Sequence, residues 1–352
     1  MSAVLDRLDL PLVLAPLAGG PSTPELAAAV SNAGALGFLA SGYLSAAQTA
    51  ERIASTRQLT GRPFGANVFV PGSGPSDPAL YDDYVRALRV EIAAAGVEPG
   101  EPRYSDDDWA AKLELLLADP LDVVSFTFGC PSQQTLRALR SAGSETWVTV
   151  TSVEEAELAV DAGADVLVVQ GSEAGGHRGS FSDEPGAPVH GLLALLQLVA
   201  PAVELPLVAA GGIATGAGAL AALAAGASAA QLGTAFMLCP EAGTAAAHRT
   251  AIATASPTGL TRAFTGRLAR GIRNRFQEQH PDAPAAYPEI HYVTAPLRQA
   301  ARERDDRQNI NLWAGETHSL ARAEPAGGVV ARVAAEAGPL LASLRRPRGA
   351  RE

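Results

Sequence analysis

One short phrase occurs four times in this chain: a helical pattern ends at a glycine, and a short apolar strand pattern follows at once. The four copies lie at residues 32–39, 141–148, 161–168 and 225–232. In each copy the glycine stands where a left-handed C-cap would end a helix. The irregular distances between the copies exclude a solenoid repeat. We therefore interpret them as helix-to-strand junctions of one α/β architecture, which requires a mainly parallel sheet.

The whole chain can be divided into alternating strand and helix patterns. Candidate strands lie at residues 11–16, 36–40, 64–69, 122–127, 145–150, 165–170, 206–210 and 228–234. Helical patterns separate them near residues 24–33, 46–59, 132–142, 153–162, 189–201, 215–225 and 243–254. Eight such units predict a (β/α)8 TIM barrel. An open doubly wound sheet is the weaker alternative, because no G-x-G-x-x-G phrase follows the first strand.

A first stretch that a minimal barrel does not need lies between the third and fourth strands. Residues 71–119 open with a turn-rich segment and continue with helical patterns near 78–95 and 105–118. Ser105 and the three aspartates after it have the composition of a capped helix start. We expect this stretch to be a helical insertion.

A second such stretch follows the eighth unit. Residues 259–352 contain helical patterns at 295–306 and near 328–344. We expect a barrel domain over residues 1–258, which includes the insertion 71–119, and a C-terminal extension over 259–352. The extension would pack on the barrel as a lid.

Composition and charge indicate a soluble, compact enzyme. The chain has 352 residues, is 47% hydrophobic and carries a net charge of −10, which argues against nucleic acid or an anionic membrane as partner. Gln197, Glu204, Pro206 and repeated glycines interrupt the apolar stretch 191–238, so barrel elements explain it better than a membrane span. Cys130 and Cys239 are far apart and have no metal or redox spacing, so no metal is expected. The N-terminus has no secretory pattern, and we expect a cytoplasmic monomer or homodimer.

Residues 165–179 carry the clearest functional signal. An apolar, β-branched strand runs directly into a glycine-rich segment that contains His177. Glycines let a backbone approach a ligand closely, and α/β folds place their chemistry just beyond the carboxyl ends of strands. His177 is also the one side chain of this loop that titrates near neutrality, whereas Glu173 and Arg178 are expected to fix the loop or to be solvated. The alternative is an ordinary tight loop with a solvated histidine.

Two further glycine turns end the seventh and eighth strands. They lie in residues 206–215, which contain Gly211 and Gly212, and in residues 231–235, which contain Gly233 and Thr234. Barrels often bind a phosphate at this place through loop amides and a short helix. Together the two turns predict a phosphate-bearing ligand; taken singly, each could be an ordinary turn.

With these segments in place, the chain resembles the FMN-dependent nitronate monooxygenases, formerly called 2-nitropropane dioxygenases, which are flavin-binding TIM barrels. The resemblance covers nearly the whole chain. Its most specific part is residues 173–179, the segment that contains His177 and that we call the histidine loop. The segments that carry it are residues 11–20, 65–69, 173–179, 210–213, 231–234, 270–276 and 311–315.

The resemblance implies a role for each matching residue. Asn67 and Gln170 would hydrogen-bond the isoalloxazine ring of FMN, and Gly175 would let the loop backbone meet the flavin. His177 would be the catalytic residue. The FMN phosphate would be held by Gly212, Gln231, Leu232, Gly233 and Thr234. The residues by themselves leave another reading open, in which Asn67 and Gln170 are hydrogen-bonded buried amides of the barrel rim.

The implied reaction is the oxidation of alkyl nitronates, such as propionate-3-nitronate, by O2 to a carbonyl compound and nitrite or nitrate. His177 could act in two ways: as a charged or hydrogen-bonding group that stabilises the anion, or as a neutral base that removes the α-proton of a nitroalkane. Two alternatives stay open. One is a flavin-dependent enoyl-thioester reductase that uses NAD(P)H. The other is a flavin-free barrel that binds a phosphorylated metabolite as a lyase, isomerase or sensor.

Overall fold

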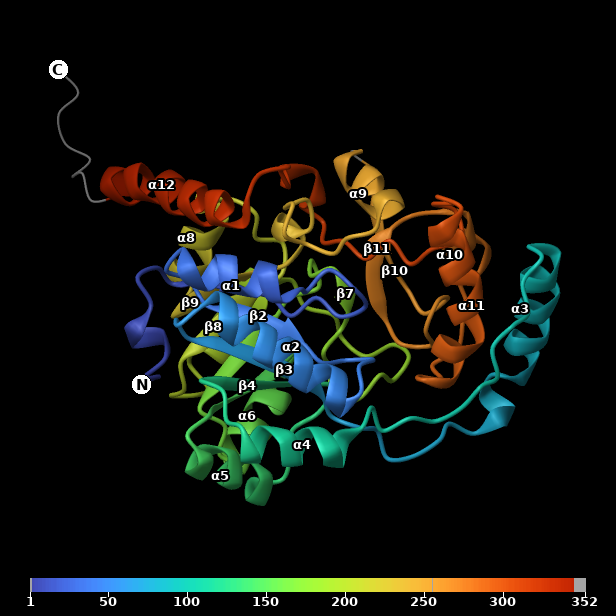
Figure 1. Ribbon diagram of the computed structural model, residues 1–352, viewed down its shortest axis with the longest axis horizontal. Helices are drawn as coiled ribbons and strands as arrows, with labels where there is room; N and C mark the ends of the chain where they lie inside the picture. Colours follow the sequence, from blue (N-terminus) through green and yellow to red (C-terminus); the bar gives the residue numbers. More distant parts are fainter. Residues whose placement is uncertain (1, 255, 345–352) are drawn as a thin grey trace.

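The computed structural model describes residues 2–254 and 256–344, and its centre is a barrel of eight parallel strands (Figure 1). These are β1 (Leu12–Leu14), β2 (Gly37–Ala40), β3 (Phe64–Phe69), β4 (Val123–Thr127), β5 (Glu145–Val150), β6 (Val166–Gln170), β8 (Leu207–Ala210) and β9 (Ala229–Leu232). Each lies within one of the eight predicted strand segments, usually one to three residues shorter at an end.

The strands close into a ring. Their order is β1-β9-β8-β6-β5-β4-β3-β2, and the last strand returns to the first through a parallel bridge between Val13 and Leu36. The Leu14 amide donates to the Leu36 carbonyl at 2.8 Å, and the Leu36 amide donates to the Leu12 carbonyl at 3.0 Å. The predicted (β/α)8 barrel is therefore confirmed, and the open doubly wound sheet is excluded.

Helices alternate with the strands as predicted. They are α1 (Pro24–Asn32), α2 (Ala46–Leu59), α4 (Trp109–Ala118), α5 (Gln133–Ala142), α6 (Val153–Ala162), α7 (Leu192–Val199), α8 (Gly216–Ala224) and α9 (Ala246–Ala253). The glycines of the four repeated phrases, Gly34, Gly143, Gly163 and Gly226, have φ angles of 89°, 108°, 91° and 106°. The left-handed caps inferred from the sequence are thus present at all four junctions.

The segment after β3 contains two helices that behave differently. α4 packs against α2 and α5 and completes the ring of barrel helices, whereas α3 (Asp82–Ala94) leaves the barrel (Figure 1). The predicted capped start at Ser105 is wrong. α4 begins at Trp109, after Asp108 in a left-handed conformation that makes no side-chain cap, and the Ser105 hydroxyl accepts a hydrogen bond from the Asp107 amide instead.

The insertion helix α3 packs against the C-terminal part of the chain. Its apolar face meets α10 (Arg275–Gln279) and α11 (Glu289–Glu303) in one buried cluster that includes Leu88, Ile92 and Val293. α11 begins six residues before the predicted start at 295. Pro296 lies inside this helix, although proline is normally found at a helix start.

The last helix, α12 (Ala326–Leu344), lies across α8 and α1 on the outside of the barrel (Figure 1). The Glu336 carboxylate accepts a hydrogen bond of 2.8 Å from the Gly216 amide at the start of α8. A Cβ atom at Gly216 would lie 2.5 Å from the α12 backbone, so the two helices are in close backbone contact.

A second, three-stranded sheet was not anticipated from the sequence. It consists of β10 (Thr258–Thr261), β11 (Ala269–Ile272) and β7 (Gly176–His177), all antiparallel. β7 has only two residues and is too short to show an alternating pattern. Its pairing places His177 opposite Ala269, so the C-terminal region is joined directly to the histidine loop.

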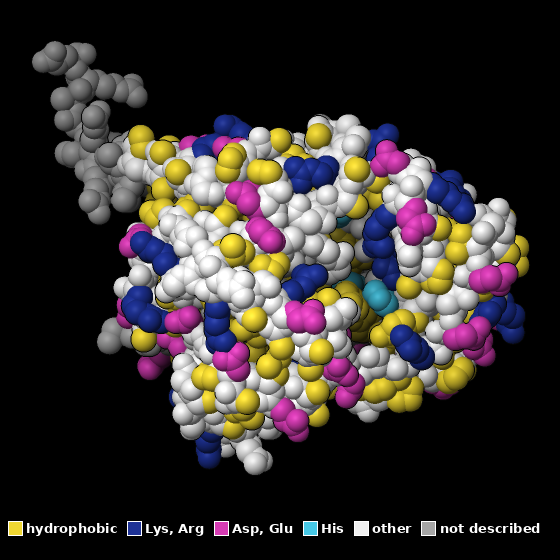
Figure 2. Space-filling model, in the orientation of Figure 1, with side chains coloured by type: hydrophobic (Ala, Val, Ile, Leu, Met, Phe, Trp, Pro, Cys, Tyr) yellow, Lys and Arg dark blue, Asp and Glu magenta, His cyan; other side chains and the backbone are white. Residues whose placement is uncertain are grey.

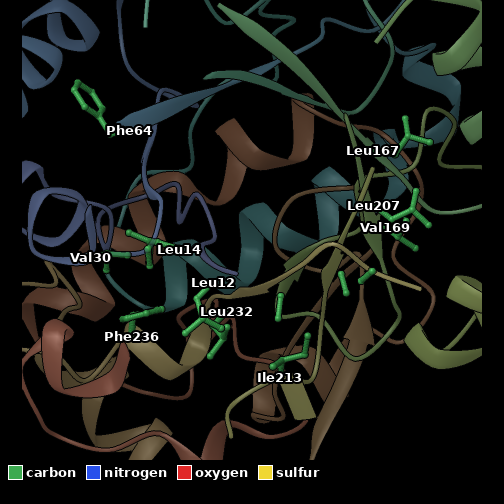
Figure 3. Close-up of a cluster of buried hydrophobic side chains, with 14 of the residues drawn as sticks. Leu12, Leu14, Val30, Phe64, Leu167, Val169, Leu207, Ile213, Leu232 and Phe236 are labelled. Carbon is green, nitrogen blue, oxygen red and sulfur yellow. The ribbon is translucent and has the colours of Figure 1, made fainter. Parts of the chain in front are cut away.

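The core follows the alternation of side chains along each strand. Leu12, Leu14, Leu167 and Val169 point outwards into the main cluster beneath the helices, part of which is drawn in Figure 3. Inward side chains fill the barrel, where the rings of Phe38 and Trp147 are 5.7 Å apart. Near the carboxyl ends of the strands, inward side chains such as Asn67 and Gln170 are polar, and there the interior opens into a cavity.

Candidate active site

A cavity of about 340 Å³ lies at the carboxyl ends of the barrel strands. Figure 2 shows the hollow between the barrel and the part of the molecule that contains α10 and α11, with histidine atoms visible inside it. Eight of the nine residues predicted for the site line this cavity: Asn67, Gln170, Gly175, His177, Gly212, Gln231, Gly233 and Thr234. The strand ends named from the sequence therefore meet around one cavity, and the role of each residue there stays a prediction.

Leu232 is the exception. Its neighbour Gln231 faces the cavity, so Leu232 faces the opposite side of the strand and packs in the hydrophobic core (Figure 3). Its side chain is 1% exposed, and its carbonyl accepts a hydrogen bond of 2.8 Å from the Ala15 amide. The Leu232 side chain therefore belongs to the core, whereas that of Gln231 can reach a ligand, and contact of Leu232 with the FMN phosphate stays a prediction.

Gln170 fixes the histidine loop. Its Nε2 donates to the His177 carbonyl at 3.2 Å, and its Oε1 accepts from the Gly179 amide at 2.7 Å. The side chain of Gln170 thus bonds to the backbone on both sides of Arg178. Strand pairing between β7 and β11 holds the same loop from the other direction.

The imidazole of His177 is enclosed by aromatic rings. Phe128, Tyr287 and Trp313 have ring centroids between 5.5 and 5.8 Å from it. Its Nε2 is 2.9 Å from the hydroxyl of Thr265, which lies in the connection between β10 and β11. The side chain is therefore held in one orientation at the wall of the cavity.

Burial, together with the charges of Arg267 and Arg298, lowers the pKa of His177 to about 3. The imidazole is consequently neutral at physiological pH. Of the two roles left open by the sequence, the charged imidazolium is disfavoured, and the imidazole is in the unprotonated form that a proton acceptor requires. Glu173 and Arg178, expected to fix the loop or to be solvated, both fix it: Glu173 accepts from the Leu192 amide at the start of α7, and Arg178 donates to the Thr151 carbonyl at 3.1 Å.

Gly175 and Gly212, which both line the cavity, have different surroundings. A Cβ atom at Gly175 would lie 2.5 Å from the backbone of Ala314 and Gly315, so this position must be glycine for contact with the chain itself. Gly212 has a φ of 67° and therefore needs glycine for its conformation. A Cβ there would also approach the side chain of Glu173 at 3.0 Å.

Polar groups of Asn67 and Thr234 also line the cavity. Asn67 is 2% exposed, and its Nδ2 donates to the hydroxyls of Ser125 at 2.9 Å and Thr127 at 3.0 Å. The Thr234 hydroxyl accepts from the Gly315 amide at 3.0 Å, which leaves its proton available to a ligand. Asn67 and Gln170 are thus hydrogen-bonded amides of the rim, and contact with a flavin ring stays a prediction for both.

The C-terminal region supplies site residues that the sequence analysis missed. His291, Arg298 and Arg302 lie on one face of α11 and line the cavity. The Arg298 guanidinium donates to the His291 carbonyl at 2.7 Å and to the Thr294 hydroxyl at 3.1 Å. Helical spacing of these polar residues within an apolar segment was the available signal, but the helix was predicted to begin after His291.

The cavity is electrostatically positive. Among the described residues its lining contains two arginines and no aspartate or glutamate. Arg298 is 4% exposed, and within the described part of the chain neither it nor Arg302 forms an ion pair with a carboxylate. Burial lowers the pKa of Arg298 to about 10, so it remains charged at neutral pH. A buried cation without a counter-charge is costly, which favours an anionic ligand.

Two other kinds of site find no support in the described residues. No group of three or more His, Cys, Asp or Glu side chains is arranged to hold a metal ion there. Within the same residues, no helix combines the length and apolar character needed to cross a membrane.

Comparison with known proteins agrees with this geometry. The sequence model of the nitronate monooxygenase family matches residues 4–336. A nitronate monooxygenase of Pseudomonas aeruginosa is 42% identical over 331 residues, which are 91% of this chain and 93% of the relative. The solved structure of nitroalkane oxidase from Streptomyces ansochromogenes superposes with a TM-score of 0.94 at 48% identity, covering 97% of this chain and all of the other. FabK from Thermotoga maritima superposes with a TM-score of 0.75 at 25% identity, covering 98% of each chain.

Proposed function

Because this chain belongs to the nitronate monooxygenase family and is a flavin-dependent oxidoreductase, we propose that it oxidises alkyl nitronates with FMN and dioxygen. The products would be a carbonyl compound and nitrite or nitrate. The observation that carries the proposal is the neutral, half-buried His177 in the wall of a positively charged cavity that has no described acidic residue in its lining. The positive charge suits an anionic nitro compound, and the neutral imidazole suits removal of a proton from carbon.

The cavity fits a phosphate-bearing flavin. Gly212, Gly233 and Thr234 would hold the phosphate, and Asn67 with Gln170 would lie along the ring system. A Cβ atom at Gly233 would lie 3.3 Å from the Leu17 side chain and 3.4 Å from that of Ala15, so there is little room for a side chain at this turn. The proton of the Thr234 hydroxyl is available to a ligand. When bound, the flavin supplies the acceptor for the electrons of the substrate and passes them to dioxygen.

The residues of the chain supply proton transfer and charge stabilisation. With a neutral nitroalkane, His177 would accept the α-proton, since its imidazole is uncharged and fixed by the hydroxyl of Thr265. The negative charge that develops on the nitro oxygens would be stabilised by the charges of Arg298 and Arg267, which already act on His177. A preformed nitronate would need only binding and orientation.

The alternative function is reduction of an enoyl thioester by NAD(P)H. The likeness to FabK shows that the same barrel architecture is shared at lower identity and lower TM-score. The cavity lining supports the nitronate proposal instead, because an anionic, small substrate accounts for the unpaired buried Arg298.

A His177→Ala variant tests the proposed role of the base. Turnover of a neutral nitroalkane should fall about 10²- to 10⁴-fold, the usual loss when a positioned acid or base is removed. The loss on the preformed nitronate should be smaller, and bound FMN, measured by its absorbance and by chromatography after release, should be retained. The control is His190→Ala, which lies outside the cavity lining. Wild-type rates of His177→Ala on both substrates would refute the assignment.

A further inference from the structure

Strained backbone is concentrated on one side of the cavity. Among the described residues five non-glycine residues have a positive φ, and four of them are Tyr43 (67°), Asp107 (55°), Asp108 (59°) and Phe128 (77°). Tyr43 and Phe128 line the cavity, and Asp107 and Asp108 contact the loop that carries Tyr43. Such conformations are costly for side chains with a Cβ and persist where the surroundings enforce them, often at functional sites.

Tyr43 lies in the loop between β2 and α2, and a buried ion pair holds this loop. The Tyr43 amide donates to Asp107 Oδ1 at 2.8 Å. Asp107 Oδ2 accepts from Nζ of Lys112 at 2.7 Å, and the same Nζ donates to the Ser41 carbonyl at 2.9 Å. Lys112 is 0% exposed, so its charge depends on this pairing. The loop is thereby fixed at Ser41 and at Tyr43 to the start of α4.

Neighbouring side chains also fix the orientation of the Tyr43 ring. It stacks on the ring of His291 with centroids 4.4 Å apart and an interplanar angle of 5°. Its hydroxyl accepts a hydrogen bond of 3.2 Å from the hydroxyl of Tyr287, whose ring centroid is 5.7 Å from that of His177. Because Tyr287 is the donor in this pair, the Tyr43 proton is free to be donated into the cavity.

Burial raises the pKa of Tyr43 to about 12. The phenol is therefore neutral at physiological pH and can act as a hydrogen-bond donor. Tyr43 and His177 also share two cationic neighbours, since Arg267 and Arg298 act on the pKa of both. The two side chains consequently belong to the same part of the cavity.

We propose that the Tyr43 hydroxyl donates a hydrogen bond to a nitro oxygen of the substrate, and that Asp107 with Lys112 positions it. This inference rests on the proposed function. When the α-C–H bond breaks, its proton goes to the imidazole of His177, its electron pair forms the C=N bond, and charge moves onto the nitro oxygens. A hydrogen-bond donor at those oxygens therefore stabilises the transition state more than it stabilises the bound nitroalkane.

A Tyr43→Phe variant tests the donor, because it removes one hydroxyl and keeps the ring. Anaerobic flavin reduction by a neutral nitroalkane should slow about 10- to 100-fold, the loss expected for one hydrogen bond to a charged group. With a preformed nitronate the same variant should mainly show a higher KM. FMN content and Tm should stay at the wild-type values. The control is Tyr104→Phe, whose hydroxyl bonds to the Gly72 carbonyl outside the cavity lining.

The outcomes distinguish failure of the proposed function from failure of the proposed role of Tyr43. If wild-type protein is not reduced by either nitro compound, the proposed function fails. If the wild type is reduced and Tyr43→Phe reacts at the same rate and KM, only the role of Tyr43 fails.

The positioning role is tested by Asp107→Ala, which removes the acceptor for the Tyr43 amide. It should slow reduction by the nitroalkane, and adding Tyr43→Phe to it should cause little further loss, because both changes remove the same interaction. Asp107→Asn keeps an acceptor oxygen and should recover part of the rate. Independent, additive losses, or no recovery in Asp107→Asn, would overturn the positioning role. Tyr43→Phe still decides the donor role if Asp107→Ala does not fold.

Discussion

Replacement of Gly175 by alanine tests whether this glycine is needed for contact with the chain itself or for contact with the flavin. A Cβ there would lie 2.5 Å from backbone atoms of Ala314 and Gly315, about 1 Å closer than carbon atoms pack. Backbone cannot rotate away as a side chain can, so the histidine loop and residues 311–315 must separate. Overpacking of this size costs about 1–3 kcal/mol. With about 2.1 cal/mol/K of unfolding entropy per residue, the Tm of a chain this long should fall by about 1–4 °C.

The stability should be measured by calorimetry on protein from which the flavin has been removed. Our reasoning expects the same loss of Tm without flavin as with it, and a loss of activity of about 100-fold, because a shift near 1 Å moves His177. Gly61→Ala is the control, since nothing lies within 4 Å of its Cβ position. If Gly175→Ala leaves the flavin-free protein as stable as the wild type and only weakens FMN binding, the glycine serves the flavin and our explanation is refuted.

Three further predictions concern the titrating and capping groups. Burial lowers the pKa of His177 to about 3 and of His248 to about 4, so below pH 6.5 the unfolded chain binds protons that the folded chain does not. The free energy of unfolding should therefore fall with decreasing pH. In urea titrations between pH 4 and 6, His248→Gln should reduce the slope of this free energy against pH by about 1.4 kcal/mol per pH unit. Arg298→Met removes a charge that lowers the pKa of His177, so the acid limb of kcat/KM for a neutral nitroalkane should move to higher pH. Glu173→Ala removes the acceptor at the start of α7 and should cost about 0.5–2 kcal/mol in urea unfolding.

The barrel could be predicted from the sequence because its signals are local. A glycine cap followed at once by an apolar strand is written in adjacent residues, and Gly34, Gly143, Gly163 and Gly226 all adopt the expected conformation. Since all parallel strands of a barrel end at the same face, locating strand ends was enough to bring Asn67 together with residues more than 100 positions away.

The features that were missed depend on contacts between distant segments. β7 exists only because β11 pairs with it, and two residues give no periodic pattern. The hydrogen bond from the Tyr43 amide to Asp107 joins residues 64 positions apart, and Tyr43 adopts a left-handed backbone conformation that its residue type disfavours. Arg298 reads as an ordinary surface residue of a helix until α11 is placed over the cavity.

The central claim is that this site takes electrons from a nitronate, and one anaerobic experiment tests it most directly. Purified protein with its bound flavin is mixed without oxygen either with propionate-3-nitronate or with NADPH, and the visible absorbance of the flavin is followed. Our account predicts rapid bleaching by the nitronate and no comparable bleaching by NADPH. Rapid bleaching by NADPH, with no response to the nitronate, would contradict it and favour the enoyl-thioester reductase.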